Sequence, residues 1–521
     1  MSKHLPVLLL LLAYFACNNE SIPPTTPLTT FLTKTNNQHF DILIKNGQII
    51  DGSGSNTYKA DLLINADTIA FIGQVDTAKI IVKKTIDATG KVISPGFIDA
   101  HAHGDPMKTP DFENFLAMGV TTICLGQDGS SPSGAISEWI TQVKQQKLGV
   151  NIAQFIGHGT LRRQAGINFE KNPSAAQLAK QQTLLQNALA AGCFGMSTGL
   201  EYTPGTFAKD TELLPLAKIV GNNNSLIMSH IRNEDDEQVE NSIRELLRQG
   251  QHCNVQVSHM KSVYGKGRKR AKALLELLDN ITDSTSVTAD VYPYNASYTG
   301  IGIVFPKWAK APNDYKKVVK NRRAELLVFL KQKITERNGP TATLFGTAPY
   351  AGKTLAQLSK EQGIPYEKVL LGIGPNRASG AYFIMDDELQ TEIIEHPKVM
   401  ICSDGSPTMR HPRGYGSFAK IIEEYVSKRK RLSLAEAIRK MTSFPAQTIG
   451  ISKRGLVQQG FYADLLIFAP ANIKANATYE KPHQLATGFD YVLVNGGITM
   501  QKDSLMIESS HSFGQLLFHN L

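Results

Sequence analysis

Short apolar runs alternate with amphipathic stretches through the middle of the chain. Continuous aliphatic runs predict strands buried in a parallel sheet, and apolar residues at helical spacing predict the helices that cover it. Eight such β/α units predict an α/β fold, the TIM (β/α)8 barrel. The predicted strands are 97–103, 120–128, 151–159, 192–200, 225–231, 254–260, 286–294 and 399–405, and the helix-like segments include 133–147, 173–191, 235–249, 267–279 and 433–442.

A different pattern occupies the two ends of the chain. From residue 40 onward, and again at 463–470 and 491–500, short Ile, Leu and Val runs are bounded by Gly, Asn and Asp, which is typical of strands. These are either two unrelated β pieces or one sheet structure. We predict one small β-sandwich domain built from residues 39–95 and 451–505, beside a barrel over residues 96–450 that carries an insertion or lid at 295–398, with a C-terminal tail at 506–521.

The N-terminus has the features of an export signal. An apolar stretch of twelve residues, 5–16, follows Lys3 and is too short to span a bilayer as a helix. Ala16 precedes Cys17, which resembles a bacterial lipoprotein signal; ordinary signal cleavage nearby is the alternative. We predict a lipoprotein-type signal peptide at 1–17, a Pro- and Thr-rich tether at 18–38, and export to the periplasm or outer-membrane face with membrane contact only through a lipid anchor.

Composition excludes several classes of protein. With 42% hydrophobic residues, the chain is neither wholly disordered nor collagen-like. Its net charge of +9 is spread thinly, and the densest basic run, 266–270, has no interleaved aromatic residues, so we expect a solvated face and no nucleic-acid partner. Five cysteines without a CxxC pair argue against a disulfide framework or a zinc knuckle. Four of them, Cys124, Cys193, Cys253 and Cys402, stand in apolar settings that predict burial.

Candidate metal ligands stand where the predicted strands end. His101 and His103 are two residues apart, so they point to the same side of a strand. His230, His259 and Asp404 end three other strands, and the carboxyl ends of barrel strands form the active-site face. Imidazole and carboxylate together suit Zn, Mn or Fe, with Zn the default for hydrolysis.

A set of motifs covers almost the whole mature chain. In order they read PGFIDAHAHGD, GVTT, GHGTLR, GMSTGLEYTPG, SHIRNE, VSHMKS, DVYPY, CSDG, HPRGYGSF, MTSFPAQTIGI and RGLVQQGFYADLLIF. In this order and at these strand ends, they resemble the amidohydrolase superfamily and, within it, the N-acyl-D-amino-acid deacylase (D-aminoacylase) family.

The resemblance implies roles for these residues. His101 and His103 would form one metal subsite and His230 and His259 another, holding one or two ions, with Asp404 as the general acid and base. The family commonly ends strand two with an Asn-Cys pair whose thiolate binds metal, whereas this chain has Gln127 and Asp128 there. We therefore hypothesise that Asp128 is a metal ligand, and that Cys124, four residues earlier, only packs.

The implied reaction is hydrolysis of the amide bond of N-acyl-D-amino acids, which are small-molecule substrates. The resemblance suggests that Lys261, Tyr292 and Arg413 clamp the α-carboxylate. His158 either lies near the metal or supports a loop, and Glu201 with Tyr202 either shapes the acyl pocket or fixes a loop. An additional Arg or Lys in the pocket would favour acyl-D-glutamate or acyl-D-aspartate, whereas an apolar pocket would favour D-Met, D-Leu or D-Phe derivatives.

Two other classes compete with this interpretation. Dihydroorotases, hydantoinases and isoaspartyl-dipeptidase-like enzymes of the same superfamily commonly use a carboxylated bridging lysine, but no Lys ends predicted strands three or four. A catalytically silent binding lipoprotein would have lost metal ligands or the strand-eight Asp, and this chain has both. Oligomeric state, acyl-chain preference and side-chain preference stay open.

Overall fold

The centre of the computed structural model, which describes residues 38–280, 286–506 and 513–519, is made of parallel strands. β9 pairs in parallel with β8 and with β10, and a second parallel sheet has the order β11-β12-β13-β14-β15-β19. Every predicted segment contains a strand, because its aliphatic run is buried on both faces. These strands are β8 (Phe97–Asp99), β9 (Val120–Leu125), β10 (Asn151–Gln154), β11 (Ile156–Gly157), β12 (Gly195–Gly199), β13 (Leu226–His230), β14 (Asn254–Val257), β15 (Val287–Val291) and β19 (Val399–Ile401).

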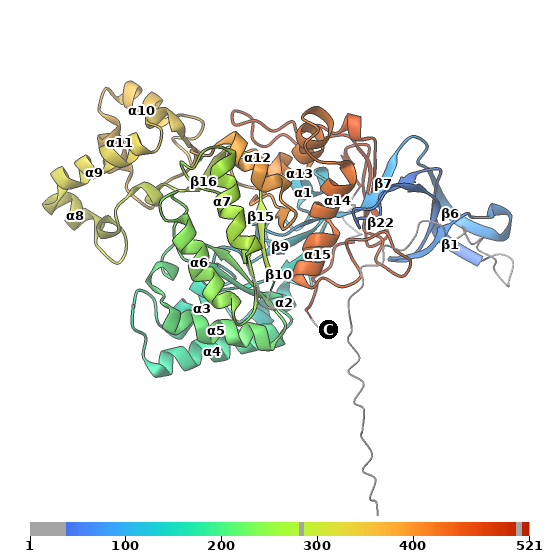
Figure 1. Ribbon diagram of the computed structural model, residues 1–521, viewed down its shortest axis with the longest axis horizontal. Coiled ribbons are helices and arrows are strands. Elements are labelled where there is room, and N and C mark those ends of the chain that lie inside the picture. Colours follow the sequence, from blue (N-terminus) through green and yellow to red (C-terminus); the bar gives the residue numbers. More distant parts are fainter. Residues whose placement is uncertain (1–37, 281–285, 507–512, 520–521) are drawn as a thin grey trace, which may run out of the picture.

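Amphipathic helices follow most of these strands (Figure 1). The predicted helical segments correspond to α2 (Ile136–Val143), α4 (Ala175–Ala190), α6 (Val239–Gly250), α7 (Gly267–Asp279) and α14 (Leu434–Met441), of which α6 ends one residue beyond its predicted segment. α4 begins with a capping box, in which the Ser174 side chain and Gln177 satisfy each other's backbone N–H groups. Further helices in this layer are α1 (Glu113–Ala117), α3 (His158–Ala165), α5 (Asp210–Asn222), α12 (Asp387–Glu395), α13 (Arg413–Lys420) with its π-helical continuation (Ile421–Lys428), and α15 (Ser443–Ile449).

Strands from both chain ends share one sheet. β7 (Val92–Pro95) pairs in parallel with β2 (Gln48–Ile49) and antiparallel with β20 (Leu465–Phe468), so it joins the N-terminal strands to the C-terminal ones. A buried cluster includes Ile44 and Ile64 from one end and Leu465 and Leu493 from the other. The other strands are β1 (Gln38–Lys45), β3 (Tyr58–Lys59), β4 (Asp61–Asn65), β5 (Thr68–Gly73), β6 (Ile80–Asp87), β21 (Phe489–Val494), β22 (Gly497–Gln501) and β23 (Ser504–Leu505).

The segment between β15 and β19 forms a separate lobe, at the opposite end of the molecule from β1 and β6 (Figure 1). It has a three-stranded sheet and its own apolar cluster, which includes Leu326, Leu330 and Phe345. The predicted insertion 295–398 also includes α12, which packs on α7, a helix outside the lobe, and Arg268 forms an ion pair with Glu392 there. The lobe contains β16 (Ala296–Gly300), α8 (Tyr315–Asn321), α9 (Arg323–Glu336), β17 (Thr343–Phe345), α10 (Leu355–Gln362), α11 (Tyr366–Ile373) and β18 (Ser379–Phe383).

The described part of the predicted C-terminal tail packs against the amino ends of the strands. Gln515 accepts a hydrogen bond from the Ile152 backbone N–H at 2.9 Å, and the His519 N–H donates to Gly192 at 3.0 Å. The predicted signal peptide and all of the tether except Gln38 lie outside the described residues, so export and lipid anchoring stay predictions.

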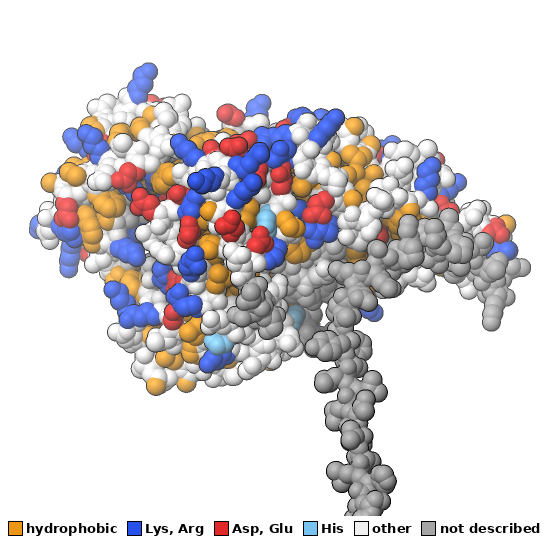
Figure 2. Space-filling model, viewed as in Figure 1, with side chains coloured by type: hydrophobic (Ala, Val, Ile, Leu, Met, Phe, Trp, Pro, Cys, Tyr) orange, Lys and Arg blue, Asp and Glu red, His pale blue; other side chains and the backbone are white. Residues whose placement is uncertain are grey.

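Among the described residues, no helix combines the length and apolarity needed to cross a membrane. Acidic and basic side chains are interspersed on the face shown in Figure 2. Within the basic run, Arg270 pairs with Asp236 and Arg268 with Glu392, at 2.6 and 2.8 Å.

Candidate metal centre and active site

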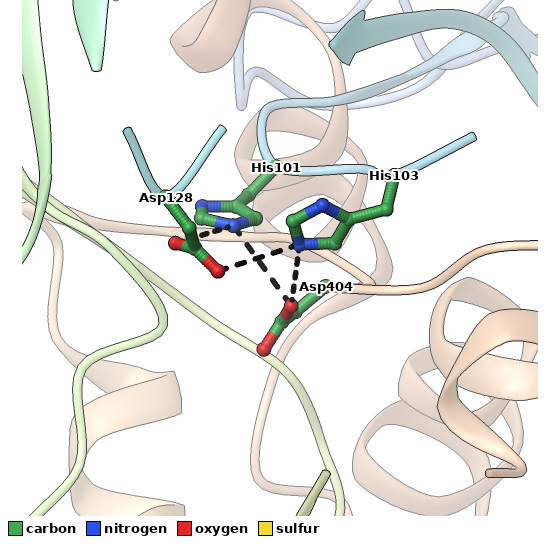
Figure 3. A group of neighbouring side chains, drawn as sticks. All are labelled: His101, His103, Asp128 and Asp404. Atoms are coloured by element: carbon green, nitrogen blue, oxygen red, sulfur yellow. Dashed lines mark hydrogen bonds and ion pairs between the residues drawn. The ribbon is translucent and has the colours of Figure 1, made fainter. Parts of the chain in front are cut away.

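Two histidines and two aspartates converge beyond the carboxyl ends of β8, β9 and β19 (Figure 3). The Nε2 atoms of His101 and His103 lie 3.3 and 3.5 Å from the Asp128 carboxylate. The Asp404 Oδ1 atom lies 3.1 Å from His103 Nε2 and 3.8 Å from His101 Nε2. These four side chains present ligand atoms within 4.8 Å of one another, so the structure brings together four residues that the sequence singled out.

His230 and His259 extend this cluster on the other side of Asp128. The Asp128 Oδ1 atom lies 3.3 Å from His259 Nε2 and 3.8 Å from His230 Nδ1. The two imidazoles are 3.0 Å apart, between His230 Nδ1 and His259 Nε2. Asp128 therefore stands between the two histidine pairs.

The donor set fits a divalent cation. His101 is fully buried, and neither of its ring nitrogens has a hydrogen-bond partner, which is costly for an imidazole unless a metal takes that place. Around the histidines, the carboxylates of Asp128, Glu201, Glu234 and Asp404 face the cations Lys261 and Arg413, which leaves an excess of two negative charges among these six side chains. Imidazole and carboxylate ligands are those that Zn, Mn and Fe accept.

The backbone that carries these candidate ligands is strained and is fixed by hydrogen bonds to two buried carboxylates. Asp128, His259 and Asp404 have φ values of 55°, 37° and 49°, in the left-handed region that residues other than Gly rarely adopt. Such strain is typical of functional sites. The buried Asp99 carboxylate accepts hydrogen bonds from the backbone N–H groups of His101 and Ser403, at 3.2 and 3.0 Å. Asp290 accepts from the His259 N–H at 2.7 Å.

The three predicted carboxylate-binding residues lie together beside this cluster. Arg413 is buried, and its Nη1 lies 2.8 Å from Asp404 Oδ2. Its guanidinium stands 4.7 Å from the ring centroid of Tyr292, and Lys261 Nζ stands 5.9 Å from the same ring. Burial acts to raise the pKa of Asp404, but Arg413 and His259 outweigh it and hold that pKa well below its usual range. Burial raises the pKa of Tyr292 to about 12, so its hydroxyl stays a donor.

Lys261 is already paired in this structure. Its ammonium lies 2.6 Å from Glu234 Oε1 and 2.8 Å from His259 Nδ1. Glu234, which also lies 3.1 Å from His259 Nδ1, was not among the predicted site residues. It stands in the motif SHIRNE, four residues after His230, where the chain has already left the strand and strand periodicity gives no information on direction.

Glu201 and Tyr202 belong to the site. Glu201 Oε2 lies 3.0 Å from His230 Nε2, and the Tyr202 ring lies 4.4 Å from the His230 ring. Both line the same cavity as His230. Asp99 and Asp290 were also missed by the sequence analysis. Asp99 stands two residues before His101, and Asp290 lies on β15, the strand next to β14, which precedes His259.

His158 lies elsewhere. The predicted third strand ends at Gly157, and His158 is the first residue of α3, so it is not a strand-end residue. It is buried, and its Nε2 lies 2.8 Å from Glu212, which also pairs with Arg162. His158 is not among the residues that line the active-site cavity, so its alternative role, supporting the local structure, is the one this geometry favours.

Cys124 is fully buried in β9, and burial raises the pKa of its thiol well above the usual value. A thiol in this state packs and is not poised to bind a metal. The four described cysteines, Cys124, Cys193, Cys253 and Cys402, are all free and buried, as their apolar settings predict.

A cavity of about 230 Å³ opens over the cluster. Its floor includes His103, Asp128, His230 and His259, and the Lys261, Tyr292 and Arg413 side chains form one wall. The lobe between β15 and β19 supplies much of the rest, including Tyr298, Ile303, Arg337 and Ile384. The inserted lobe therefore encloses the site.

Comparison with known proteins matches this description. The amidohydrolase family model matches residues 368–500. An N-acyl-D-glutamate deacylase of Alcaligenes xylosoxydans xylosoxydans is 30% identical, over 88% of this chain and 93% of its own length. An N-acyl-D-aspartate deacylase of the same organism is 29% identical, over 88% and 91%.

Among solved structures, an N-acyl-D-glutamate deacylase from Bordetella bronchiseptica, complexed with zinc and a phosphonate mimic of the tetrahedral intermediate, superposes with a TM-score of 0.80. It is 29% identical, and the match covers 92% of this chain and all of that one. The similarity thus extends over most of the chain. The chain belongs to the N-acyl-D-amino-acid deacylase family of the amidohydrolases.

Proposed function

We propose that this protein hydrolyses the amide bond of N-acyl-D-amino acids, releasing a carboxylate and a free D-amino acid. The observation that carries the proposal is the contact of two sets of side chains. The His and Asp cluster, suited to a metal ion, adjoins Arg413, Tyr292 and Lys261, suited to an α-carboxylate. A substrate that is both an amide and a carboxylate fits this pair of subsites.

We propose Zn²⁺ as the cofactor, as one or two ions, with Mn²⁺ or Fe²⁺ as alternatives. His101, His103, Asp128, His230 and His259 would hold it. A bound ion of this kind supplies Lewis-acid polarisation and lowers the pKa of water. Asp128 replaces the thiolate common in the family, and its two carboxylate oxygens face both histidine pairs, so a bridging role fits its position.

Asp404 is placed for proton transfer. Its two oxygens are divided between the two subsites, because Oδ1 faces His103 and Oδ2 faces Arg413. A carboxylate at this junction can take a proton from the attacking water and return it to the departing amine, so one residue serves as base and then as acid. Arg413 and Tyr292 would bind the α-carboxylate and thereby fix the position of the scissile amide.

Arg337 favours an acidic amino-acid side chain. It comes from the lobe, is buried, lines the cavity, and its Nε atom has no hydrogen-bond partner. Asp235 is shared between Arg337 Nη1 at 4.0 Å and Lys333 Nζ at 3.2 Å, so these three side chains carry one excess positive charge. We therefore propose acyl-D-glutamate or acyl-D-aspartate as preferred substrates, in line with the named activities of the two relatives.

The finer architecture also belongs to this proposal. The edges of the two parallel sheets approach at the Ala102–Gly405 bridge, where the His103 N–H donates to Gly405 at 2.7 Å. At the other edge, β10 runs into β11 after a single residue. We propose that the strands form one closed TIM barrel, and that the sheets from the two chain ends form a small β-sandwich domain.

The test is an assay of metal-stripped and Zn-, Mn- or Fe-reconstituted protein on N-acetyl-D- and N-acetyl-L-forms of Glu, Asp and Leu. We expect activity only with metal, a D over L preference of about a hundredfold or more, and higher kcat/KM for the acidic side chains. Activity on L substrates alone, or none with any metal, would overturn the proposed function.

The role of Asp128 is tested by metal content as well as by rate. We expect Asp128→Ala to lose bound metal and activity, and Asp128→Cys, the residue type usual in the family, to retain metal. Unchanged metal stoichiometry in Asp128→Ala would show that this residue is not a ligand.

A further inference from the structure

A second, larger cavity meets the active-site cavity at the metal centre. It has a volume of about 550 Å³, against about 230 Å³ for the first, and lies between the loop after β8 and the segment that leads into α2. The two cavities share His103 and Asp128. The side chains of these two residues are 31% and 16% exposed, whereas that of His101 is fully buried, so the partly open members of the cluster stand at the junction.

This arrangement divides a substrate in two. If the proposed function holds, the scissile amide lies at the cluster, and the amino-acid half extends towards Arg413 and Lys261 in the first cavity. The acyl half is on the other side of the carbonyl carbon, where the second cavity opens. We propose that the second cavity is the acyl-binding site, and that it takes an acyl group larger than acetyl, peptide-like in polarity and without negative charge.

The size of the cavity supports a large acyl group. Cavities of about 300–1,000 Å³ hold ligands of drug size, whereas an acetyl group adds a single methyl beyond the carbonyl. The Trp139 indole lines the cavity from α2 and offers a flat apolar surface. An acetyl group would leave most of this space to water.

The lining supports peptide-like polarity. It is rich in neutral hydrogen-bonding side chains, including three serines and three glutamines: Ser130, Ser131, Ser133, Gln127, Gln142 and Gln154. Neutral donors and acceptors of this kind suit the amide groups of a peptide-like acyl group.

Charge supports the exclusion of anions. Apart from the shared cluster residues, the charged side chains lining the cavity are the acidic Glu138 and Asp105, of which Asp105 pairs with Lys108 at 3.4 Å. The lining residues include no Lys or Arg, in contrast to the first cavity. An acyl group with a carboxylate, such as succinyl, would meet like charges, whereas a neutral or cationic group would not.

The first experiment compares three acyl groups on whichever D-amino acid the wild type hydrolyses fastest as its N-acetyl derivative. We expect kcat/KM for the N-(acetyl-L-alanyl) derivative to exceed that for N-acetyl by about tenfold, and N-succinyl to fall about tenfold below N-acetyl. A strict preference for acetyl or succinyl would overturn the acyl site while leaving the deacylase function intact. If no N-acetyl-D-amino acid were hydrolysed at all, the result would count against the proposed function instead.

Two adjacent residues of α2 provide a matched pair of variants. Both residues are exposed, but Gln142 lines the cavity and its neighbour Thr141 does not. We expect Gln142→Trp to lower kcat/KM for the acetylalanyl substrate about tenfold and to leave the acetyl substrate within about twofold, and Thr141→Trp to change neither. Equal effects of Gln142→Trp on both substrates, or none, would overturn the proposal.

A binding measurement is independent of turnover. The chain has two tryptophans, Trp139 and Trp308, so in Trp308→Phe the emission reports on Trp139. Added N-acetyl-L-alanine, the expected acyl product, should change this emission saturably, and acetate should not. Identical responses to the two acids would place the acyl group outside this cavity.

Discussion

The two ends of the parallel strands differ in whether their buried charges are balanced by opposite charges. At the amino ends, Arg454 and Asp464 form an ion pair whose side chains are 2% and 4% exposed. The same carboxylate accepts hydrogen bonds from Asn151 at 3.1 Å and from the Asn495 backbone N–H at 2.8 Å. Both charges of this pair are balanced within the chain.

At the carboxyl ends the charges do not balance. Carboxylates exceed cations around the four histidines, and His101 has no hydrogen-bond partner for either ring nitrogen. Buried groups left in this state cost stability, and such an arrangement is kept where a ligand completes it. The comparison separates burial that stabilises the fold from burial that prepares a site.

We expect the largest effect from a substitution at the carboxyl ends of the strands, on catalysis. Asp404→Asn keeps the size of the side chain but removes the base at the junction of the two subsites, so we expect kcat to fall by about three to four orders of magnitude, about 4–5 kcal/mol. Metal content should stay close to wild type.

Asp279→Asn, the same change on an exposed carboxylate of α7, is the matched control and should keep full activity. If kcat of Asp404→Asn fell by less than tenfold, Asp404 would be excluded as the general base. Loss of bound metal in that variant would assign Asp404 to the ligand set instead.

We expect the next largest effect from a substitution at the amino ends of the strands, on stability. Arg454→Met leaves Asp464 buried without its cation, and we expect a loss of about 3 kcal/mol in the free energy of unfolding, measured by urea denaturation. Because this pair lies at the other end of the strands, kcat/KM of the metal-loaded enzyme should stay within about twofold of wild type.

Adding Asp464→Asn to Arg454→Met removes the unpaired charge and should restore part of the lost stability. If Arg454→Met lowered activity as strongly as stability, the buried pair at the amino ends would not be independent of the active site at the carboxyl ends.

The sequence predicted the carboxyl end better than the amino end, for a physical reason. Aliphatic runs mark where a parallel strand lies, and the polar residues that follow them are then candidates for the site, which is how His101, His230, His259 and Asp404 were found. Glu234 escaped this reasoning because it lies on a loop whose path depends on tertiary packing. Residues 513–519, which pack at the amino ends, follow no periodic pattern that would have placed them there.

His158 shows where strand reasoning overreaches. Its segment reads as one continuous strand, but the chain turns into α3 at that residue and buries the imidazole against Glu212. A polar residue directly after an apolar run can start a helix as well as end a strand, and the letters GHGT do not distinguish the two. Contact with Glu212, 54 residues away in the chain, decides the outcome.

The smallest expected effect is a pH dependence at the amino end. Lys440 is buried, and its ammonium donates to the backbone carbonyls of Val399, at 2.7 Å, and His396. Burial lowers the pKa of Lys440 from 10.5 to about 7. Between these two pH values the unfolded chain binds a proton that the folded chain does not, so folding is favoured increasingly as the pH rises.

Relative to Lys440→Met, wild-type protein should therefore gain stability from pH 7.5 to pH 9, by about 1–2 kcal/mol. The lost hydrogen bonds weaken the variant equally at both pH values, so they cancel from this difference. Urea denaturation of both proteins at the two pH values measures it, and parallel curves would show that Lys440 keeps its charge and that the amino end tolerates a buried cation held only by carbonyl oxygens.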